Sequence, residues 1–354
     1  MTSQVEQWLE TVWAAGGTDL HIAAGRAPSG RVDGRLEPLP GVEILDEDAA
    51  SAIILGYLEA HGPDLGEHDD VDFGLTLKDE VRVRGNVYRE RGGLAMALRL
   101  IPLRIPTLAE LGLPPAVERL ASWPSGLVVV TGPTGSGKST TLASMIDAIN
   151  RNRPCHVLTI EDPVEYVHAH DKALISQRQI GTDVDSFDSA LRAALREDPD
   201  VVLVGEMRDA DSIQAALTIA ETGHLVLTTL HTNDTAQAVD RIVDVFPAER
   251  RAQIQVQLAA TLQGVIYQQL LPRIGGGMVV ATEVMVATHA VRNLVREGKS
   301  RQLRNVVATS QSDGMRTLEH NLSELVASGV VSHEAAVAVS LHPAEIKKKA
   351  PTVS

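Results

Sequence analysis

Residues 132–139 read Gly-Pro-Thr-Gly-Ser-Gly-Lys-Ser, and this stretch decides the fold class of the chain. It matches the Gly-x-x-x-x-Gly-Lys-Ser/Thr pattern of a phosphate-binding loop at every position. The apolar run 127–131 before it predicts a buried strand, and the pattern at 140–149 predicts a helix. Glycines let successive backbone amides point at phosphate oxygens, and the start of a helix adds a positive dipole. The sequence therefore predicts a nucleoside triphosphate site; the alternative is a glycine-rich turn that holds no ligand.

The loop itself provides the first group of predicted site residues. Lys138 is expected to reach the β- and γ-phosphates, and the hydroxyl of Ser139 to complete a Mg²⁺ shell. The full set of predicted nucleotide-binding residues in this stretch is Gly132, Pro133, Thr134, Gly135, Ser136, Gly137, Lys138, Ser139 and Thr140.

The pattern around the loop predicts an α/β domain over residues 125–354. Short apolar runs alternate with helical patterns, which is typical of a mostly parallel sheet. A long helix is expected at 249–270, a strand at 278–285 and mainly helices over the last sixty residues, ending in a solvated tail with Lys347, Lys348 and Lys349. The buried strands are expected at 127–131, 157–160, 201–204 and 225–229.

Residues 1–101 predict a separate, small α+β domain. A helical pattern near the start is followed by an alternating stretch at 19–22 and by Asp33-Gly34, the core of a tight hairpin. A second helix is expected at 45–60, and strand patterns return at 71–77, 81–88 and 94–101. The prolines between 102 and 124 predict a linker.

Two acidic residues follow predicted buried strands in the α/β domain. Glu206 ends the apolar run 201–204, and Glu161 ends the run 157–160. The carboxyl ends of parallel strands open onto one crevice, so both carboxylates are expected beside the loop. We assign Glu206 to the outer shell of Mg²⁺ and Glu161 to the orientation of the attacking water, with the reverse assignment open. Solvated acids that cap strands are the alternative.

His224 and His231 flank the predicted strand 225–229. They read either as a metal pair, for which a third ligand with suitable spacing is missing, or as groups that hydrogen-bond to phosphate or to a neighbouring acid. We expect His231 to act in catalysis and His224 to contact the nucleotide. A purely structural role is the remaining alternative.

Arginines gather in the first domain although the chain as a whole is acidic. Phosphoryl transfer uses arginines supplied from another domain or subunit, and this group offers candidates, of which Arg84 and Arg99 are expected on separate strands. Exposed strand charges without a role in catalysis are the alternative. The other members of this basic group are Arg82, Arg89 and Arg91.

Composition excludes several classes of protein. The 32 basic against 46 acidic residues give a net charge of −14, which argues against general attraction to nucleic acid or to anionic lipid. Only 3% of residues are aromatic, so stacking platforms for single strands are scarce. A single cysteine excludes an internal disulfide framework and a multi-cysteine zinc site. With neither a signal-peptide pattern nor a long apolar run, the sequence predicts a soluble, cytoplasmic protein.

The motifs together resemble the secretion and type IV pilus motor ATPases, and most closely the retraction ATPases, over residues 18–335. Four blocks occur in the order of that family: the loop at 132–139, an acidic box at 159–165, a second nucleotide box at 195–209 and a histidine box at 221–231. The segment 290–297, Ala-Val-Arg-Asn-Leu-Val-Arg-Glu, is similar to the signature of retraction enzymes. Replacing Arg292 or Leu294 there is predicted to spare ATP hydrolysis and abolish fibre withdrawal.

The resemblance implies a PAS-like N-terminal domain joined to a RecA-like ATPase domain with a helical C-terminal region. It implies ATP as substrate, a homohexamer, and Arg84 and Arg99 reaching the nucleotide from the N-terminal domain. It further implies an inner-membrane platform protein as partner, with the pilin fibre reached indirectly, the extension ATPase as a further partner, and a position at the cytoplasmic face of the pilus base. Arg89 and Arg91 are not assigned, because residues 87–92 depart from the family pattern.

Three other functions compete with retraction. Pilus extension and type II secretion assembly use related ATPases, but those relatives usually carry extra N-terminal domains and a four-cysteine zinc insertion. A nucleotide-gated scaffold with little turnover would not need Glu161, Glu206 and candidate arginines together. A DNA translocase on the RecA-like fold is disfavoured by charge and by the scarcity of aromatic residues.

Overall fold

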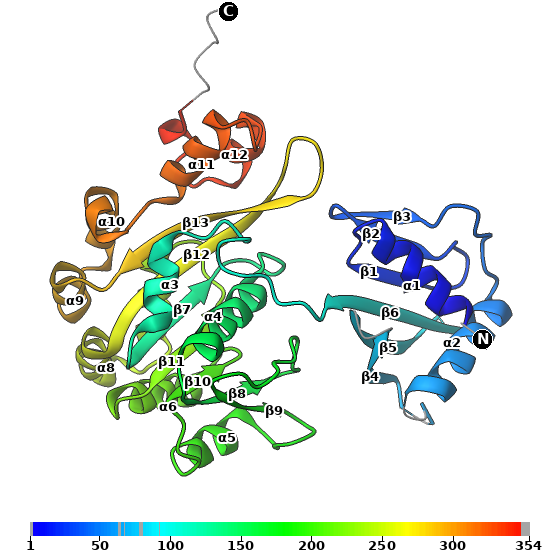
Figure 1. The fold of residues 1–354 in the computed structure, drawn as a ribbon, viewed down its shortest axis with the longest axis horizontal. Helices are drawn as coiled ribbons and strands as arrows, with labels where there is room; N and C mark the ends of the chain where they lie inside the picture. The colour runs from blue at the N-terminus through cyan, green and yellow to red at the C-terminus, as the bar shows by residue number, and fades with distance from the viewer. Residues whose placement is uncertain (1–2, 63–64, 67, 78–80, 92, 348–354) are drawn as a thin grey trace, which may run out of the picture. The chain divides into compact units, whose positions relative to one another are not determined.

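The computed structural model describes residues 3–62, 65–66, 68–77, 81–91 and 93–347. The chain divides into two compact units, residues 1–104 and 105–354, and each is described by itself (Figure 1). Lys348 and Lys349 of the expected tail lie outside the described residues. No helix within these ranges is both long and apolar enough to span a bilayer.

The described residues of the first unit form a six-stranded antiparallel sheet with two helices, which agrees with the small α+β domain expected from the sequence. Its strand order is β3-β2-β1-β6-β5-β4. Asp33 and Gly34 have φ angles of 47° and 80°, as a tight two-residue hairpin turn requires. The elements are α1 (Gln4–Ala14), β1 (Asp19–Ile22), β2 (Ser29–Val32), β3 (Arg35–Pro38), α2 (Glu47–His61), β4 (Asp70–Leu77), β5 (Val81–Glu90) and β6 (Gly93–Pro102).

The second unit is built on a seven-stranded, mostly parallel sheet of order β13-β12-β7-β11-β10-β8-β9, in which only β13 is antiparallel. The elements around and within the sheet are α3 (Pro115–Ser122), β7 (Gly126–Thr131), α4 (Lys138–Asn152), β8 (His156–Glu161), β9 (Leu174–Gln179), α5 (Phe187–Ala194), β10 (Val201–Val204), α6 (Ala210–Glu221), β11 (Leu225–Leu230), α7 (Thr235–Asp244), α8 (Ala248–Thr261), β12 (Leu262–Pro272) and β13 (Met278–Val286). The C-terminal region adds α9 (His289–Arg296), α10 (Leu303–Thr309), α11 (Leu318–Ala327) and α12 (His333–Val339), with 3₁₀ turns η1 (Ser300–Gln302), η2 (Gln311–Asp313) and η3 (Pro343–Glu345).

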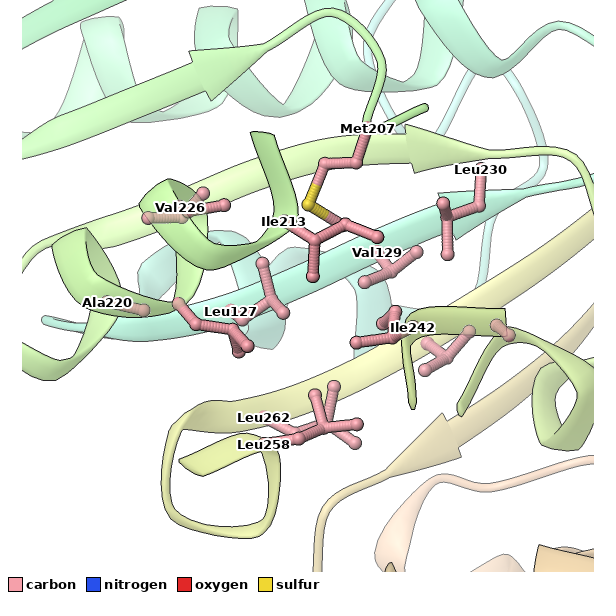
Figure 2. Close-up of a cluster of buried hydrophobic side chains, with 14 of the residues drawn as sticks. Leu127, Val129, Met207, Ile213, Ala220, Val226, Leu230, Ile242, Leu258 and Leu262 are labelled. Carbon is pink, nitrogen blue, oxygen red and sulfur yellow. The ribbon is translucent and has the colours of Figure 1, made fainter. Parts of the chain in front are cut away.

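The interior strand β7 contributes to a hydrophobic core on each face of this sheet. Leu127 and Val129 point into the core formed with α6, α7 and α8, as Figure 2 shows, while Val128 and Val130 point into the core formed with α3 and α4. A strand with both faces covered reads as a continuous apolar run, because neither set of alternating side chains meets water. This is why the sequence predicts β7, β8, β10 and β11 correctly.

The expected long helix at 249–270 is wrong in its second half. Helix α8 ends at Thr261, and β12 follows directly, paired with β7 on one side and β13 on the other. Tertiary pairing decides the conformation here, since local propensity is a weak guide. Beyond β12, residues 273–277 form the turn to β13, and Gly275, Gly276 and Gly277 all have positive φ with open space around them.

The expected linker at 102–124 also differs from the structure. The second unit begins at Ile105, and α3 packs its buried residues Val117 and Leu120 into the core beside α4. Prolines punctuate this stretch, yet an amphipathic helix of eight residues follows Pro114. Strand β9 is not predicted from the sequence, because its residues are half-exposed and polar at the sheet edge.

Candidate nucleotide site

The site lies where four parallel strands end. In register, Leu230 of β11 pairs with Thr131 of β7, Thr228 with Val204 of β10, and Val204 with Ile160 of β8. The segments that follow these strands therefore emerge at one edge of the sheet, as the sequence predicts for the loop 132–139 and the two carboxylates.

The loop adopts a conformation that its glycines make possible. Gly132, Gly135 and Gly137 have φ angles of 147°, 77° and 86°. A Cβ atom on Gly132 would collide with the backbone oxygen of Gln268, so no larger residue fits there. Helix α4 begins at Lys138, directly after Gly137, and aims its N-terminus at the loop. The geometry is that of an anion cradle.

The ammonium group of Lys138 is held inside this cradle. Its Nζ donates to the carbonyl oxygens of Gly132 at 2.9 Å and Pro133 at 3.0 Å. Burial lowers the pKa of Lys138, and the nearby carboxylates of Glu206 and Glu165 oppose that shift. Lys138 thus lies close enough to Glu206 for the two side chains to interact.

Gln268 is a residue of the site that the sequence does not single out. It lies on β12 with 1% of its surface exposed, and its Nε2 donates to the carbonyl oxygen of Ser136 at 2.6 Å. The Oγ of Ser136 is buried and has no hydrogen-bond partner among the described residues. The loop 132–139 is therefore supported by β12, for which the sequence predicts a helix. This wrong prediction is why no local signal identifies Gln268 as a site residue.

Glu161 and Ser139 line the same cavity, together with Tyr166, His168 and Thr229. The Oε1 of Glu161 accepts from Thr159 Oγ1 at 2.7 Å and from Gln177 Nε2 at 3.3 Å. Burial raises the pKa of Glu161, while these two hydrogen bonds oppose the rise. A carboxylate with a raised pKa beside the phosphate cradle is suited to accept a proton from water.

Glu206 lies between Arg208 and His231. Arg208 Nε donates to its Oε2 at 2.8 Å, and His231 Nε2 lies 3.6 Å from its Oε1. Burial lowers the pKa of His231, the charge on Lys138 lowers it further, and Glu206 raises it. Lys138, Glu206 and His231 therefore form one group, as expected, whereas Arg208 is not predicted from the sequence.

His224, by contrast, does not lie near the phosphate loop of its own chain. It precedes β11 at the opposite end of that strand, and six strand residues span about 20 Å. Its Nδ1 lies 3.0 Å from Thr222 Oγ1 and 3.1 Å from the oxygen of Ile219, at the end of α6. The expectation that His224 contacts the nucleotide beside the loop is corrected here: the two histidines flank one strand, so they lie at opposite edges of the sheet.

Arg84 and Arg99 belong to the first unit, where they occupy directly paired positions of β5 and β6. Arg99 Nε donates to Asp19 Oδ1 at 2.9 Å, and 63% of its side chain is exposed. Their expected approach to a nucleotide stays a prediction.

The donor set suits a hard divalent cation held with phosphate. Ser139 provides a hydroxyl, and Glu161 and Glu206 provide carboxylates, all oxygen donors of the kind Mg²⁺ prefers. Within the described ranges, no group of three His, Cys, Asp or Glu residues could hold a metal ion by itself. His224 and His231 lie at opposite ends of β11 and do not form a metal pair.

The chain is similar to a known protein family and to curated proteins of that family. The family described as Type II/IV secretion system protein matches residues 68–276. The type IV pilus retraction ATPase PilT of Pseudomonas aeruginosa is 46% identical over 320 residues, which cover 90% of this chain and 93% of that protein. A twitching motility protein of Neisseria gonorrhoeae is 50% identical over 268 residues, 75% of this chain and 72% of that protein.

The fold agrees with the sequence comparison. A crystal structure of the pilus retraction motor PilT with bound ADP matches with a TM-score of 0.85 and 42% identity. The match covers 98% of this chain and 99% of that one. The predicted combination of a small N-terminal α+β domain with a P-loop ATPase domain is confirmed.

Proposed function

Because this chain belongs to the type II/IV secretion system protein family, and within it to the group of the retraction ATPase PilT, we propose that it hydrolyses ATP to retract type IV pili. The observation that carries the proposal is the meeting of Lys138, Glu161 and Glu206 at the edge where the parallel strands end. A nucleotide-binding loop alone would be sufficient for a scaffold that only binds ATP, whereas the carboxylates of Glu161 and Glu206 would be needed for ATP hydrolysis.

Binding would use the loop and the start of α4. The backbone amides of residues 132–139 and the helix dipole attract the phosphates, and Lys138 exchanges its bonds to Gly132 and Pro133 for bonds to the β- and γ-phosphates. Ser139 and Glu206 would hold Mg²⁺, directly or through water. Bound Mg²⁺ would neutralise the negative charge that develops on the phosphates.

Turnover would use Glu161 to orient the attacking water and take its proton. Thr159 and Gln177 fix the carboxylate of Glu161, which lines the same cavity as Ser139. His231, whose Nε2 lies 3.6 Å from Glu206 Oε1, would sense the γ-phosphate through Glu206. The exchange of roles between Glu161 and Glu206 is the alternative within the same chemistry.

The assembled machine would be a homohexamer at the cytoplasmic face of the inner membrane. Arg84 and Arg99 would neutralise charge on the phosphates, and hydrolysis would move the platform protein so that pilin subunits leave the fibre base. The extension ATPase would be a further partner. Retraction is favoured over extension and secretion by the segment 290–297 and by a single cysteine, which excludes a four-cysteine zinc insertion.

A steady-state phosphate-release assay on the purified chain tests this proposal. Glu161→Gln is expected to retain ATP binding while its kcat falls by about a thousandfold, because the base is lost and the cradle is kept. Lys138→Ala is expected to weaken ATP binding itself. Wild-type turnover no faster than that of Lys138→Ala would end the motor hypothesis and leave the scaffold.

Cells that lack this chain separate retraction from extension. Retraction predicts long, abundant and static pili in such cells, since fibres are built and never withdrawn. Bald cells would identify an extension enzyme instead.

A further inference from the structure

Glu283 is a buried carboxylate that the mechanism above does not use. It lies on β13 with 6% of its surface exposed. Its Oε1 accepts from the backbone N–H of Thr235 at 3.0 Å and from Thr235 Oγ1 at 2.7 Å, and its Oε2 accepts from the N–H of Leu318 at 3.4 Å. No ion pair among the described residues includes it.

The two partners of Glu283 are the first residues of two helices. Thr235 begins α7 and Leu318 begins α11, so the carboxylate lies between two positive helix ends. Burying an unpaired carboxylate is costly unless hydrogen bonds and dipoles compensate. Glu283 therefore joins α7 and α11 at their N-termini, although these helices are far apart in the sequence.

Helix α7 is also the direct continuation of the loop that carries His231. Thr232 donates its N–H to Thr131 Oγ1 at 2.9 Å, and Thr131 is the residue just before the phosphate loop. Thr232 Oγ1 then donates to the carbonyl oxygen of Asp234 at 3.0 Å. The four residues from Thr232 to Thr235 are thus fixed at one end by Thr131 and at the other by Glu283, and His231 directly precedes them.

We propose that Glu283 is a positioning residue that holds the His231 loop against the C-terminal helix α11, and so sets the geometry of His231 and Glu206. The inference rests on the proposed ATPase function for its kinetic consequence. Glu283 itself does not touch the reacting atoms. Its effect passes through the four covalently linked residues 232–235, which have a hydrogen bond at each end, to the adjoining His231.

The test compares Glu283→Gln with the wild-type chain in the phosphate-release assay. An amide has one acceptor oxygen in place of two, so one of the two helix starts loses its partner. We expect kcat to fall about tenfold, because one buried hydrogen bond is lost, while KM for ATP changes by less than about twofold.

A double variant separates positioning from general damage. His231→Ala is expected to lower kcat by itself, and adding Glu283→Gln to it is expected to change kcat by less than about twofold, because both act through the same side chain. Thr235→Val removes only the hydroxyl bond to Glu283 and provides a milder variant should Glu283→Gln fail to fold. It is expected to lower kcat about threefold.

Glu319→Gln is the matched control. Glu319 is also buried and lines the same cavity as Glu283, but it bonds to Arg304 at 3.3 Å and to Ser340 at 2.7 Å. We expect wild-type kcat. Amide hydrogen exchange at residues 231–235 should accelerate in Glu283→Gln and Thr235→Val, and remain unchanged in Glu319→Gln.

Different results would overturn the role of Glu283 and the proposed ATPase function. Wild-type kcat and exchange in Glu283→Gln would overturn the role of Glu283, as would a loss of kcat that simply adds to that of His231→Ala. A wild-type chain without ATP turnover would overturn the proposed function instead, and the exchange measurement alone would then decide the role of Glu283.

Discussion

Gln268 illustrates how a single distant residue shapes the phosphate loop. Its side-chain amide supports the loop from below through the carbonyl oxygen of Ser136, more than a hundred positions earlier in the chain. Its backbone oxygen also occupies the space that a side chain at 132 would need. Strand β12 thus fixes both the residue type at Gly132 and the orientation of the carbonyl at Ser136.

Gln268→Leu is expected to weaken ATP binding about tenfold. Leucine keeps the approximate volume but leaves the buried oxygen of Ser136 without a donor, which costs about 1–3 kcal/mol in a loop that must stay rigid. Titration with a fluorescent ATP analogue measures the change in Kd. Gln269→Leu, on the next residue of the strand, is the control; an equal loss in both variants would contradict the role of Gln268.

The rate at which the Cys155 thiol is alkylated is expected to depend on pH. Burial raises its pKa, and the charge on Arg153 only partly opposes that rise. The thiolate fraction at a given pH is therefore lower than in a free thiol and grows as the pH rises. We expect iodoacetamide to alkylate Cys155 more slowly than glutathione at pH 8, as followed by mass spectrometry. A rate equal to that of glutathione would contradict the burial effect.

Helix α9 shows that the retraction-type segment 290–297 combines two kinds of residue. Arg292 is half-buried, and its guanidinium donates to the carbonyl oxygens of Ala259, Ala260 and Ala287 and to Gln263 Oε1, which ties the end of α8 to the start of β12. Arg296 is exposed and donates to Asn293 Oδ1 at 2.9 Å. The first is structural, whereas the second belongs to the outer face of the helix.

This division changes the prediction made for Arg292 from the sequence. Arg292→Ala is expected to destabilise the chain by about 2 kcal/mol, because several carbonyl groups lose their donor. Arg296→Ala is expected to alter the free energy of unfolding by less than about 0.5 kcal/mol. Urea denaturation compares the two. Only Arg296→Ala then serves to ask whether the outer face of α9 is needed for fibre withdrawal, and equal stabilities would refute the distinction.

At the scale of the whole molecule, the sequence predicts those strands and site residues whose signal lies within a short stretch of the chain. Apolar runs covered on both faces identify β7, β8, β10 and β11, and the register of these strands then brings Lys138, Glu161, Glu206 and His231 together. Long-range packing decides the rest. Strand β12 forms only because two partners flank it, and His224 reads as a site residue until the direction of β11 places it at the far edge.

Mixing two inactive variants tests whether a neighbouring subunit supplies the arginine of the ATP site. Lys138→Ala lacks the cradle lysine and Arg84→Ala lacks a candidate arginine, so each alone is expected to hydrolyse ATP poorly. If the arginine comes from a neighbouring subunit of the proposed hexamer, some sites in mixed assemblies combine an intact lysine with an intact arginine. We expect recovery of about a quarter of wild-type turnover from this statistical pairing of subunits. A mixture as inactive as its components would indicate an arginine supplied within the same chain.

The turn at 273–277 has a practical consequence for measurements on a working motor. Three consecutive glycines there adopt positive φ angles, and a Cβ atom on any of them would meet no other atom within 4 Å, while Pro272 and Met278 pair at the base of the turn. Extra residues between those glycines would lengthen the turn without shifting the strand register below it. A short peptide tag for a bead or a dye is therefore best placed here, where force or rotation is recorded from the end of β12, the strand whose Gln268 contacts the phosphate loop.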